Sequence, residues 1–329
     1  MDMILFALNA VFPVGSLCAL GYALKRIGLI PPEFARIASK LCFFVFLSTL
    51  LFLNIYKTES IAALEWGLIA YACGGILVLF ALGLIIAAIA IKDRRQKGVM
   101  IQCIFRSNFA MFGLPLSASL FGEAGAQTAA ALSIFSIPLF NILSIWALAY
   151  FSGEASEAPR AGKLIKDILK NPLTIGVLLG LLVLCIRSAF ENWGVSFRLD
   201  VSLPFLYAGI EKVGELASPL ALIVLGAQFE FSAVGALAKQ ITIATVMRLI
   251  VAPVLMLGVA YLYIPSFGGA HYAGLIALFG SPVSVASAII AQQMHADGQL
   301  AGQMVVWTTL FSGLSIFCMV LVFKMLGVF

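Results

Sequence analysis

The stretch IQCIFRSNFAMFGLPLSASLFG, residues 101–122, carries a glycine–proline kink inside a run of apolar residues. The stretch HYAGLIALFGSPVSVASAIIAQQMH, residues 271–295, repeats the arrangement, with its proline between glycine and serine residues. Proline removes a backbone donor and clashes with the preceding helical turn, so each stretch predicts a helix that is kinked or broken inside. In lipid, backbone groups freed in this way are tolerated only where they are buried in protein or line a cavity. The pair therefore predicts a binding site between two interrupted membrane helices; the alternative is a pair of ordinary proline kinks.

The composition of the whole chain agrees with a membrane protein. Of its 329 residues, 62% are hydrophobic and 11% are charged, whereas roughly a quarter are charged in an ordinary soluble domain. A water-soluble protein of this size cannot bury so much apolar surface, which excludes a soluble enzyme. The net charge of +5 would suggest an acidic partner for a soluble protein. In a membrane protein it mainly reports topology, so we expect the lipid bilayer as a partner and no nucleic acid.

Hydropathy in windows of about 19 residues predicts ten membrane helices. Their limits are 3–24, 35–56, 63–91, 99–121, 125–151, 172–190, 205–229, 240–264, 270–294 and 301–326. The alternating ten-residue segments of a membrane barrel are absent, so the sequence predicts an all-α polytopic membrane protein.

Lysine and arginine residues are distributed unequally over the two sides of such a chain, twelve against four. The twelve are Lys25, Arg26, Arg36, Lys92, Arg94, Arg95, Lys97, Arg160, Lys163, Lys166, Lys170 and Lys239, and the four are Lys57, Arg187, Arg198 and Lys324. Cytoplasmic loops carry the excess of basic residues, so both termini are expected outside. Basic and aliphatic residues mix in 160–170, which predicts a short amphipathic helix on the inner leaflet, with a solvated linker as the alternative.

The two halves of the chain resemble each other. FLSTLLFLNI at 46–55 corresponds to LASPLALIVLG at 216–226, and Pro115 corresponds to Pro282. Each half contains five spans, an odd number, so the second copy enters the membrane from the opposite side and the repeat is inverted. The predicted organisation is a first five-helix repeat at 1–151, a short basic cytoplasmic linker at 152–170 and a second, inverted repeat at 171–329.

The two breaks also predict the charge of the ligand. Each would create a new helix N-terminus in the membrane interior, at Leu116–Ser117 and at Val283–Ser284. Unpaired N–H groups and the positive end of the helix dipole favour an anion there, and the serine hydroxyls add donors. Ser281, in the second break, belongs to the same candidate set. A small carboxylate fits this arrangement better than a cation or an apolar molecule.

Further polar residues lie inside the predicted spans. Asn108 can donate and accept hydrogen bonds, which suits a carboxylate, although an interhelical packing contact is the alternative. Arg106 lies either deep in the membrane, where it must meet an anion or carbonyls, or near the cytoplasmic surface, where it can snorkel. Arg248 raises the same question, and a structural role is favoured. Gln292 and Gln293 end span nine on the cytoplasmic side and are candidates for a gate or a cap.

Several absences exclude other classes. All five aspartates lie in loops or at the chain ends, which argues against a cation/proton antiporter with paired buried aspartates. HExxH, GxSxG and P-loop motifs are missing, so we expect no enzyme. The six cysteines lie in apolar stretches without a CxxC pair, so we expect neither a metal nor a cofactor.

Four motifs point to a known family. They are FRSNFAMFGLPLSASLFGEAG (105–125), KNPLTIGVLLGLL (170–182), ELASPLALIVLGAQF (215–229) and GSPVSVASAIIAQQM (280–294). In sequence and order they resemble the auxin efflux carrier family, which includes the plant PIN carriers and compact prokaryotic permeases. The resemblance covers essentially the whole chain. Two departures stand out: residues 152–170 replace the long loop of the plant carriers, and Ser48 and Thr49 stand where relatives commonly carry a proline.

The resemblance carries expectations about fold and site. It implies ten transmembrane helices as two inverted five-helix repeats, with broken helices four and nine crossing at Pro115 and Pro282, as in bile-acid symporters. It implies a scaffold and a transport domain related by an elevator-like movement, and it makes Asn108 the substrate-contacting asparagine of span four. It also implies the inner (plasma) membrane of a prokaryotic cell. The compact relatives are often associated with malonate or malate, so auxin is not the expected substrate.

Together these observations predict a secondary transporter that moves a small organic anion, a mono- or dicarboxylate, by alternating access. The first alternative is a sodium-coupled organic-anion symporter of the bile-acid type, which needs several oxygen ligands for Na⁺; the candidates are Asn108, Ser117, Ser284 and Gln292. The second is a ligand-binding membrane sensor, against which the short loops argue. Glycines such as Gly176 and Gly180 permit helix pairing and are compatible with a homodimer.

Overall fold

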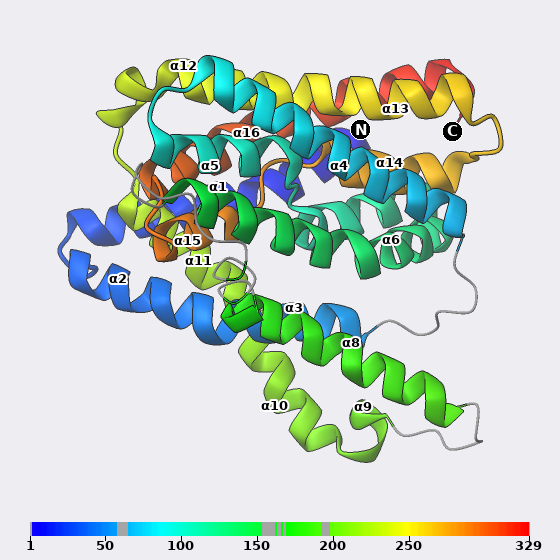
Figure 1. Cartoon of the computed structure of the whole chain (residues 1–329), viewed down its shortest axis with the longest axis horizontal. Coiled ribbons are helices and arrows are strands. Elements are labelled where there is room, and N and C mark those ends of the chain that lie inside the picture. The colour runs from blue at the N-terminus through cyan, green and yellow to red at the C-terminus, as the bar shows by residue number, and fades with distance from the viewer. Residues whose placement is uncertain are drawn as a thin grey trace.

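Helices account for nearly all of the chain in the computed structural model, which describes residues 2–57, 65–152, 169–191 and 198–328, together with 162 and 166 (Figure 1). Within these residues the only β-type contact is an isolated antiparallel bridge between Ser107 and Val283. The predicted all-α fold is therefore confirmed for the described chain. The amphipathic helix predicted at 160–170 falls mostly outside these residues.

The first half of the chain contains helices of very different length. They are α1 (Asp2–Arg26), α2 (Pro32–Leu41), the π-helical η1 (Cys42–Phe46), α3 (Leu47–Tyr56), α4 (Trp66–Ala90), α5 (Arg94–Phe105), the π-helical η2 (Phe109–Gly113) and α6 (Leu114–Ser152). The long α6 consists of two arms, because the backbone leaves helical geometry at Phe121 and Gly122. Gly122 has φ +58°, a left-handed conformation that glycine adopts without a steric penalty.

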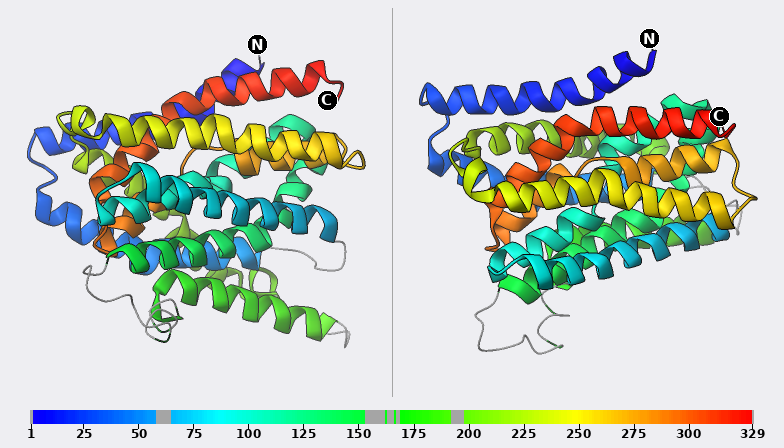
Figure 2. Two further views of the ribbon diagram at one scale, coloured as in Figure 1. Left: turned by 45° about the horizontal axis from the view of Figure 1, so that its top comes forward. Right: turned by 90° about the horizontal axis from the view of Figure 1, so that it is seen from above.

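The second half is also helical. Its elements are α8 (Pro172–Glu191), α9 (Leu199–Ser202), α10 (Pro204–Glu215), α11 (Ala217–Gln228), α12 (Ala233–Val246), the π-helical η3 (Met247–Val251), α13 (Ala252–Tyr263), α14 (Gly269–Gly280), α15 (Val285–Gln293) and α16 (Gly298–Met325). The described ends of the chain lie toward the same end of the molecule, opposite α2 (Figure 2).

Length and hydropathy mark several of these elements as membrane-spanning. In the described chain, five helical stretches are long and apolar enough to cross a bilayer: Pro32–Tyr56, Trp66–Ala90, Phe109–Phe151, Ala233–Tyr263 and Gly298–Met325. The protein is thus a polytopic helical membrane protein, as predicted. The helices α5 and α14 contain 12 residues each, about 18 Å of helix, and cannot cross about 30 Å of hydrocarbon alone.

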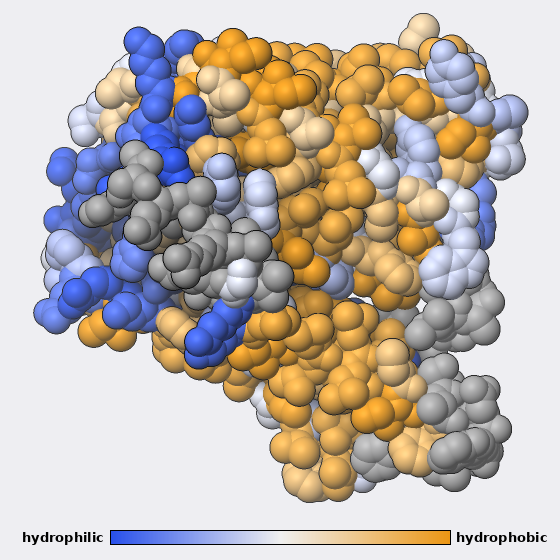
Figure 3. All heavy atoms as spheres, in the orientation of Figure 1, coloured by the Kyte–Doolittle hydropathy of each residue, from blue (hydrophilic) through white to orange (hydrophobic). Residues whose placement is uncertain are grey.

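The surface agrees with this assignment. Apolar residues cover most of the face drawn in Figure 3, whereas hydrophilic residues gather at one end, where α2 and the beginnings of α5 and α12 lie (Figure 3). Large apolar side chains such as Phe12, Ile89 and Val254 are exposed, at 71%, 81% and 67%. Such exposure suits side chains that contact lipid.

Glycines allow two helix pairs to approach closely. A Cβ on Gly226 of α11 would lie 1.9 Å from the carbonyl oxygen of Cys18 in α1. A Cβ on Gly176 of α8 would lie 2.4 Å from the carbonyl oxygen of Ser48 in α3, and Gly180 likewise faces Ile55. The glycine face considered for a homodimer is therefore occupied by α3 of the same chain.

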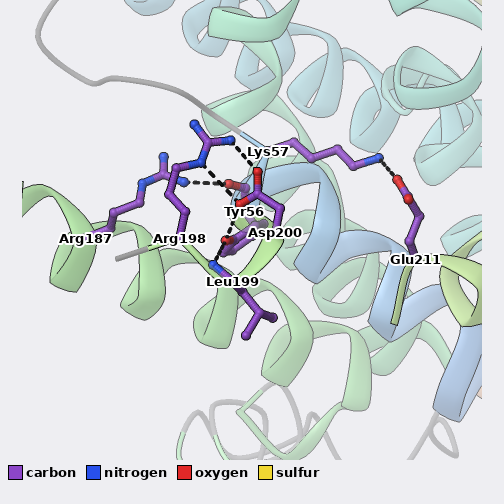
Figure 4. Close-up of polar contacts among 7 residues, drawn as sticks. All are labelled: Tyr56, Lys57, Arg187, Arg198, Leu199, Asp200 and Glu211. Carbon is purple, nitrogen blue, oxygen red and sulfur yellow. Dashed lines mark hydrogen bonds and ion pairs between the residues drawn. The ribbon is translucent and has the colours of Figure 1, made fainter. Parts of the chain in front are cut away.

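Polar contacts tie α3, α8, α9 and α10 together at one end (Figure 4). Tyr56 Oη donates to Asp200 at 3.0 Å and accepts from the N–H of Leu199 at 2.7 Å. Arg198 pairs with Asp200 at 2.9 Å, and its hydrogen bonds lower the pKa of that carboxyl. Lys57 pairs with Glu211 at 2.7 Å. These contacts fix the ends of the short helices, which bury little apolar surface themselves.

Candidate functional site

Both interrupted helices break in extended backbone, and the breaks meet. The first break runs through Arg106 (φ −86°, ψ 108°), between α5 and η2. The second runs from Ser281 (φ −65°, ψ 150°) to Ser284 (φ −63°, ψ 133°), between α14 and α15. Residues 107 and 283 pair as an antiparallel bridge, and the N–H of Asn108 donates to the carbonyl of Pro282 at 2.8 Å. The two broken segments therefore cross each other and are joined by backbone hydrogen bonds.

The position of the first break corrects the sequence-based expectation. The predicted helix start at Leu116–Ser117 is wrong, because the helix resumes as η2 at Phe109 and continues into α6. Pro115 is exposed near the start of α6. Inside a membrane helix a proline is tolerated where a local π-helical adjustment satisfies the freed backbone groups, and the π-helical η2 ends just before Leu114. The second break lies where it was predicted, since Ser284 precedes the first residue of α15.

A small cavity of about 50 Å³ lies beside the crossing. Its polar lining residues are Asn54, Arg106, Ser107, Asn108, Ser218 and Ser284, and apolar residues such as Leu50, Ile137 and Phe140 complete it. The first turns of η2 and α15 both contribute to its wall. The first N–H groups of a helix have no intrahelical partner, so two positive helix ends meet at this cavity.

Three donors at the cavity have no hydrogen-bond partner in the described chain: Arg106 Nη1, Asn54 Nδ2 and Ser107 Oγ. Arg106 is only 4% exposed, and its other terminal nitrogen, Nη2, donates to Asn141 Oδ1 at 2.8 Å. The side chain is thus buried inside the protein, whereas its depth in the bilayer stays a prediction. An unpartnered guanidinium donor is costly in a low-dielectric interior. The arrangement is suited to receive an acceptor, and a negatively charged one best.

The other sequence-predicted residues lie around this cavity or away from it. Ser117 is not among the residues that line the cavity, and its Oγ donates to the carbonyl of Gly125, eight residues further along α6, at 2.7 Å. Ser281 is buried and its Oγ donates to Ala277 at 2.5 Å. Pro282 takes part through its carbonyl alone.

Gln292 belongs to a second, larger cavity. This vestibule has a volume of about 630 Å³ and is lined by polar and basic residues that include Lys25, Arg36, Arg95, Gln228, Gln292 and Gln299. Ser39 Oγ of α2 donates to Gln292 Oε1 at 3.0 Å, and Gln293 Nε2 donates to Ser39 Oγ at 3.1 Å. Gln292 Nε2 also donates to Gln228 of α11. We call these four residues the polar latch, since they join α15 to α2 and α11.

Asn54 was missed by the sequence analysis. It is a lone amide near the end of the apolar helix LSTLLFLNIY, and a polar side chain inside such a helix is itself a signal of a functional contact. Asn54 and Arg106 line the same cavity because of the way α3 packs against the crossing. The spacing of residues along the chain does not reveal this packing.

Two interrupted helices that cross over a buried, donor-lined cavity are typical of membrane transporters. The family described as "Membrane transport protein" matches residues 6–320. The chain belongs to this family, the auxin efflux carrier family, which confirms the resemblance of the four motifs.

Two archaeal relatives have the same general description. An uncharacterized transporter from Methanothermobacter thermautotrophicus is 22% identical over 315 residues, which cover 94% of this chain and 95% of the relative. An uncharacterized transporter from Methanocaldococcus jannaschii is 24% identical over 258 residues, which cover 77% and 76%. The protein is therefore a membrane transporter.

Proposed function

We propose that the protein is a secondary transporter for a small organic anion, a mono- or dicarboxylate such as malonate or malate. The observation that carries the proposal is the set of unpartnered donors at the crossing cavity, Arg106 Nη1 above all. A carboxylate accepts two hydrogen bonds from a guanidinium fork, and such charge-assisted bonds are about twice as strong as neutral ones.

Charge supports an anion in the same place. Each helix N-terminus contributes about half a positive charge, so the beginnings of η2 and α15 together contribute about one, and Arg106 adds a full charge. No Asp or Glu is among the residues that line this cavity. A dicarboxylate can place one carboxylate at the helix ends near Asn108 and Ser284 and the other at Arg106.

Alternating access supplies the transport cycle. The crossing cavity is small, about 50 Å³, whereas the vestibule of about 630 Å³ lies at the end rich in basic residues. The polar latch joins α15, which carries half of the crossing, to α2 and α11. We propose that the crossing moves past α2, α3 and α11 in an elevator-like step, within ten spans arranged as two inverted repeats. Opening of the latch would connect the vestibule to the cavity.

The test is anion uptake into proteoliposomes by purified wild type and Arg106→Lys. Lysine keeps the charge but loses the planar fork, so we expect KM for the transported carboxylate to rise about tenfold or more. Ser136→Ala is the matched control, because it removes a buried hydroxyl of α6 that donates to the carbonyl of Leu132 and is not among the residues that line the cavity. Folded wild type without flux or binding for any carboxylate of a broad panel would overturn the proposal.

A further inference from the structure

Arg248 is the largest fully buried side chain of the described protein, with no exposed surface. It projects from η3, a π-helical segment between α12 and α13. All five N–H donors of its guanidinium are used. Nε donates to the carbonyl of Ser281 at 2.9 Å. The other acceptors are the carbonyls of Ile104 (3.2 Å) and Phe105 (3.1 Å) for Nη1 and of Leu278 and Phe279 (both 3.0 Å) for Nη2.

These acceptors are the C-terminal ends of the two half-helices that meet at the crossing. Ile104 and Phe105 end α5, and Leu278 and Phe279 lie in the last turn of α14. The last carbonyls of a helix lack intrahelical partners, and each C-terminus carries about half a negative charge. Two such ends amount to about −1, and one guanidinium supplies +1. Arg248 therefore matches the ends in both hydrogen bonds and charge.

In transporters with discontinuous helices, unwound carbonyls and half-helix C-termini are the groups that coordinate a Na⁺ or H⁺. We propose that Arg248 is an internal cation that permanently occupies this carbonyl cage and replaces a coupling cation. It joins α5 to α14, so the two halves of the crossing move as one body. The transport step then requires no Na⁺, and removal of the side chain creates a site for a free guanidinium or another monovalent cation.

The inference goes beyond the anion site, because Arg248 binds the negative helix ends, whereas the proposed anion would lie at the positive ends that follow Asn108 and Ser284. It also gives a physical reason against the alternative of a sodium-coupled symporter. A mobile cation in the cage would compete with a covalently attached guanidinium that already satisfies five carbonyls.

The first experiment measures thermal unfolding of purified Arg248→Ala and of wild type in guanidinium, Na⁺ or choline chloride. Each salt is titrated to about 20 mM at constant ionic strength, far below denaturing concentrations. We expect Tm of Arg248→Ala to lie below that of wild type and to rise saturably with guanidinium, with a smaller rise for Na⁺ and none for choline. Wild type should not respond. The variant is purified in the presence of low guanidinium, which would occupy the empty cage and stabilise the folded protein.

The matched control is Leu249→Ala, which truncates the buried neighbour in η3 without removing a donor to the cage. Its Tm should fall without any guanidinium-specific recovery. An equal response of the two variants, or none in Arg248→Ala, would overturn the proposal.

The second experiment measures carboxylate flux in proteoliposomes and rests on the proposed function. We expect wild-type flux to persist when choline replaces Na⁺, and flux of Arg248→Ala to require guanidinium or a monovalent cation. Arg248→Lys keeps the internal charge, so its flux should stay independent of Na⁺ at a reduced maximal rate. Sodium-dependent flux in wild type or in Arg248→Lys would overturn the internal cation. A guanidinium-specific Tm rise in a protein without flux would support the cage and contradict the transported substrate.

Discussion

Asn54 offers a direct test of the crossing cavity at the scale of one residue. Asn54 lines the cavity, and its buried Nδ2 has no hydrogen-bond partner in the described chain, so its loss would remove a donor to the proposed anion. We expect Asn54→Ala to raise KM for the transported carboxylate about three- to tenfold, the effect of about one hydrogen bond. The measurement is initial uptake over a range of carboxylate concentrations.

Two further substitutions at this position separate donor from charge. Asn54→Ser keeps a small donor and should retain more affinity than the alanine variant. Asn54→Asp is nearly isosteric but places a negative charge beside the anion, so it should lose the most affinity. A KM that is the same for all three variants would contradict a contact between Asn54 and the substrate.

At this scale, sequence reasoning identified the chemistry of the crossing better than its position. Polar groups inside apolar membrane helices are costly and therefore usually mark a functional site. This rule correctly pointed to three residues at the cavity: Arg106, Asn108 and Ser284. The break predicted at Pro115 was wrong, because a membrane helix can continue through a proline where the adjoining turn is π-helical. The real break, at Arg106, contains no proline. Asn54 comes from α3, and its contact with the crossing follows from tertiary packing.

Close packing of α1 on α11 leads to a prediction at the scale of elements. A Cβ on Gly226 would meet the backbone of Cys18 at 1.9 Å, so the two helices must move apart. We expect Gly226→Ala to destabilise the folded protein by about 1–3 kcal/mol, seen as a lower Tm. Gly235→Ala is the control, because nothing lies within 4 Å of its new methyl group and alanine favours a helix by about 1 kcal/mol. Equal Tm values for the two variants would contradict the close approach.

The polar latch leads to a second prediction at this scale. If α15 moves relative to α2, linking the two helices must stop transport. We expect a short bifunctional thiol reagent to block flux in a cysteine-free protein that carries Ser39→Cys and Gln292→Cys, and a reducible reagent to restore it after reduction. The control pair is Gln96→Cys with Gln240→Cys, because these side chains bond at 2.9 Å between α5 and α12. Continued flux in the linked latch variant would contradict this movement.

For the whole molecule, composition and hydropathy predict the class because they report the solvent. With 62% hydrophobic residues, the chain can fold only where apolar side chains face lipid. The helix interruptions were partly predictable from Pro282, whereas the π-helical segments η1, η2 and η3 were not. Such segments add a residue to a helical turn without a distinctive sequence. In η3 this extra residue accompanies the inward side chain of Arg248, which the sequence analysis left as a structural arginine.

The basic residues predict the orientation of the whole molecule in the membrane. Twelve of the lysines and arginines considered above lie on one predicted side and four on the other, and the side with the larger group is expected to face the cytoplasm. We therefore expect an impermeant thiol reagent, added to intact spheroplasts, to label Val328→Cys but not Asp93→Cys in a cysteine-free background. Disruption of the membrane should expose the second cysteine as a control. Labelling of Asp93→Cys in intact spheroplasts would reverse the orientation, and the vestibule beside Arg95 would then face the outside instead of the cytoplasm.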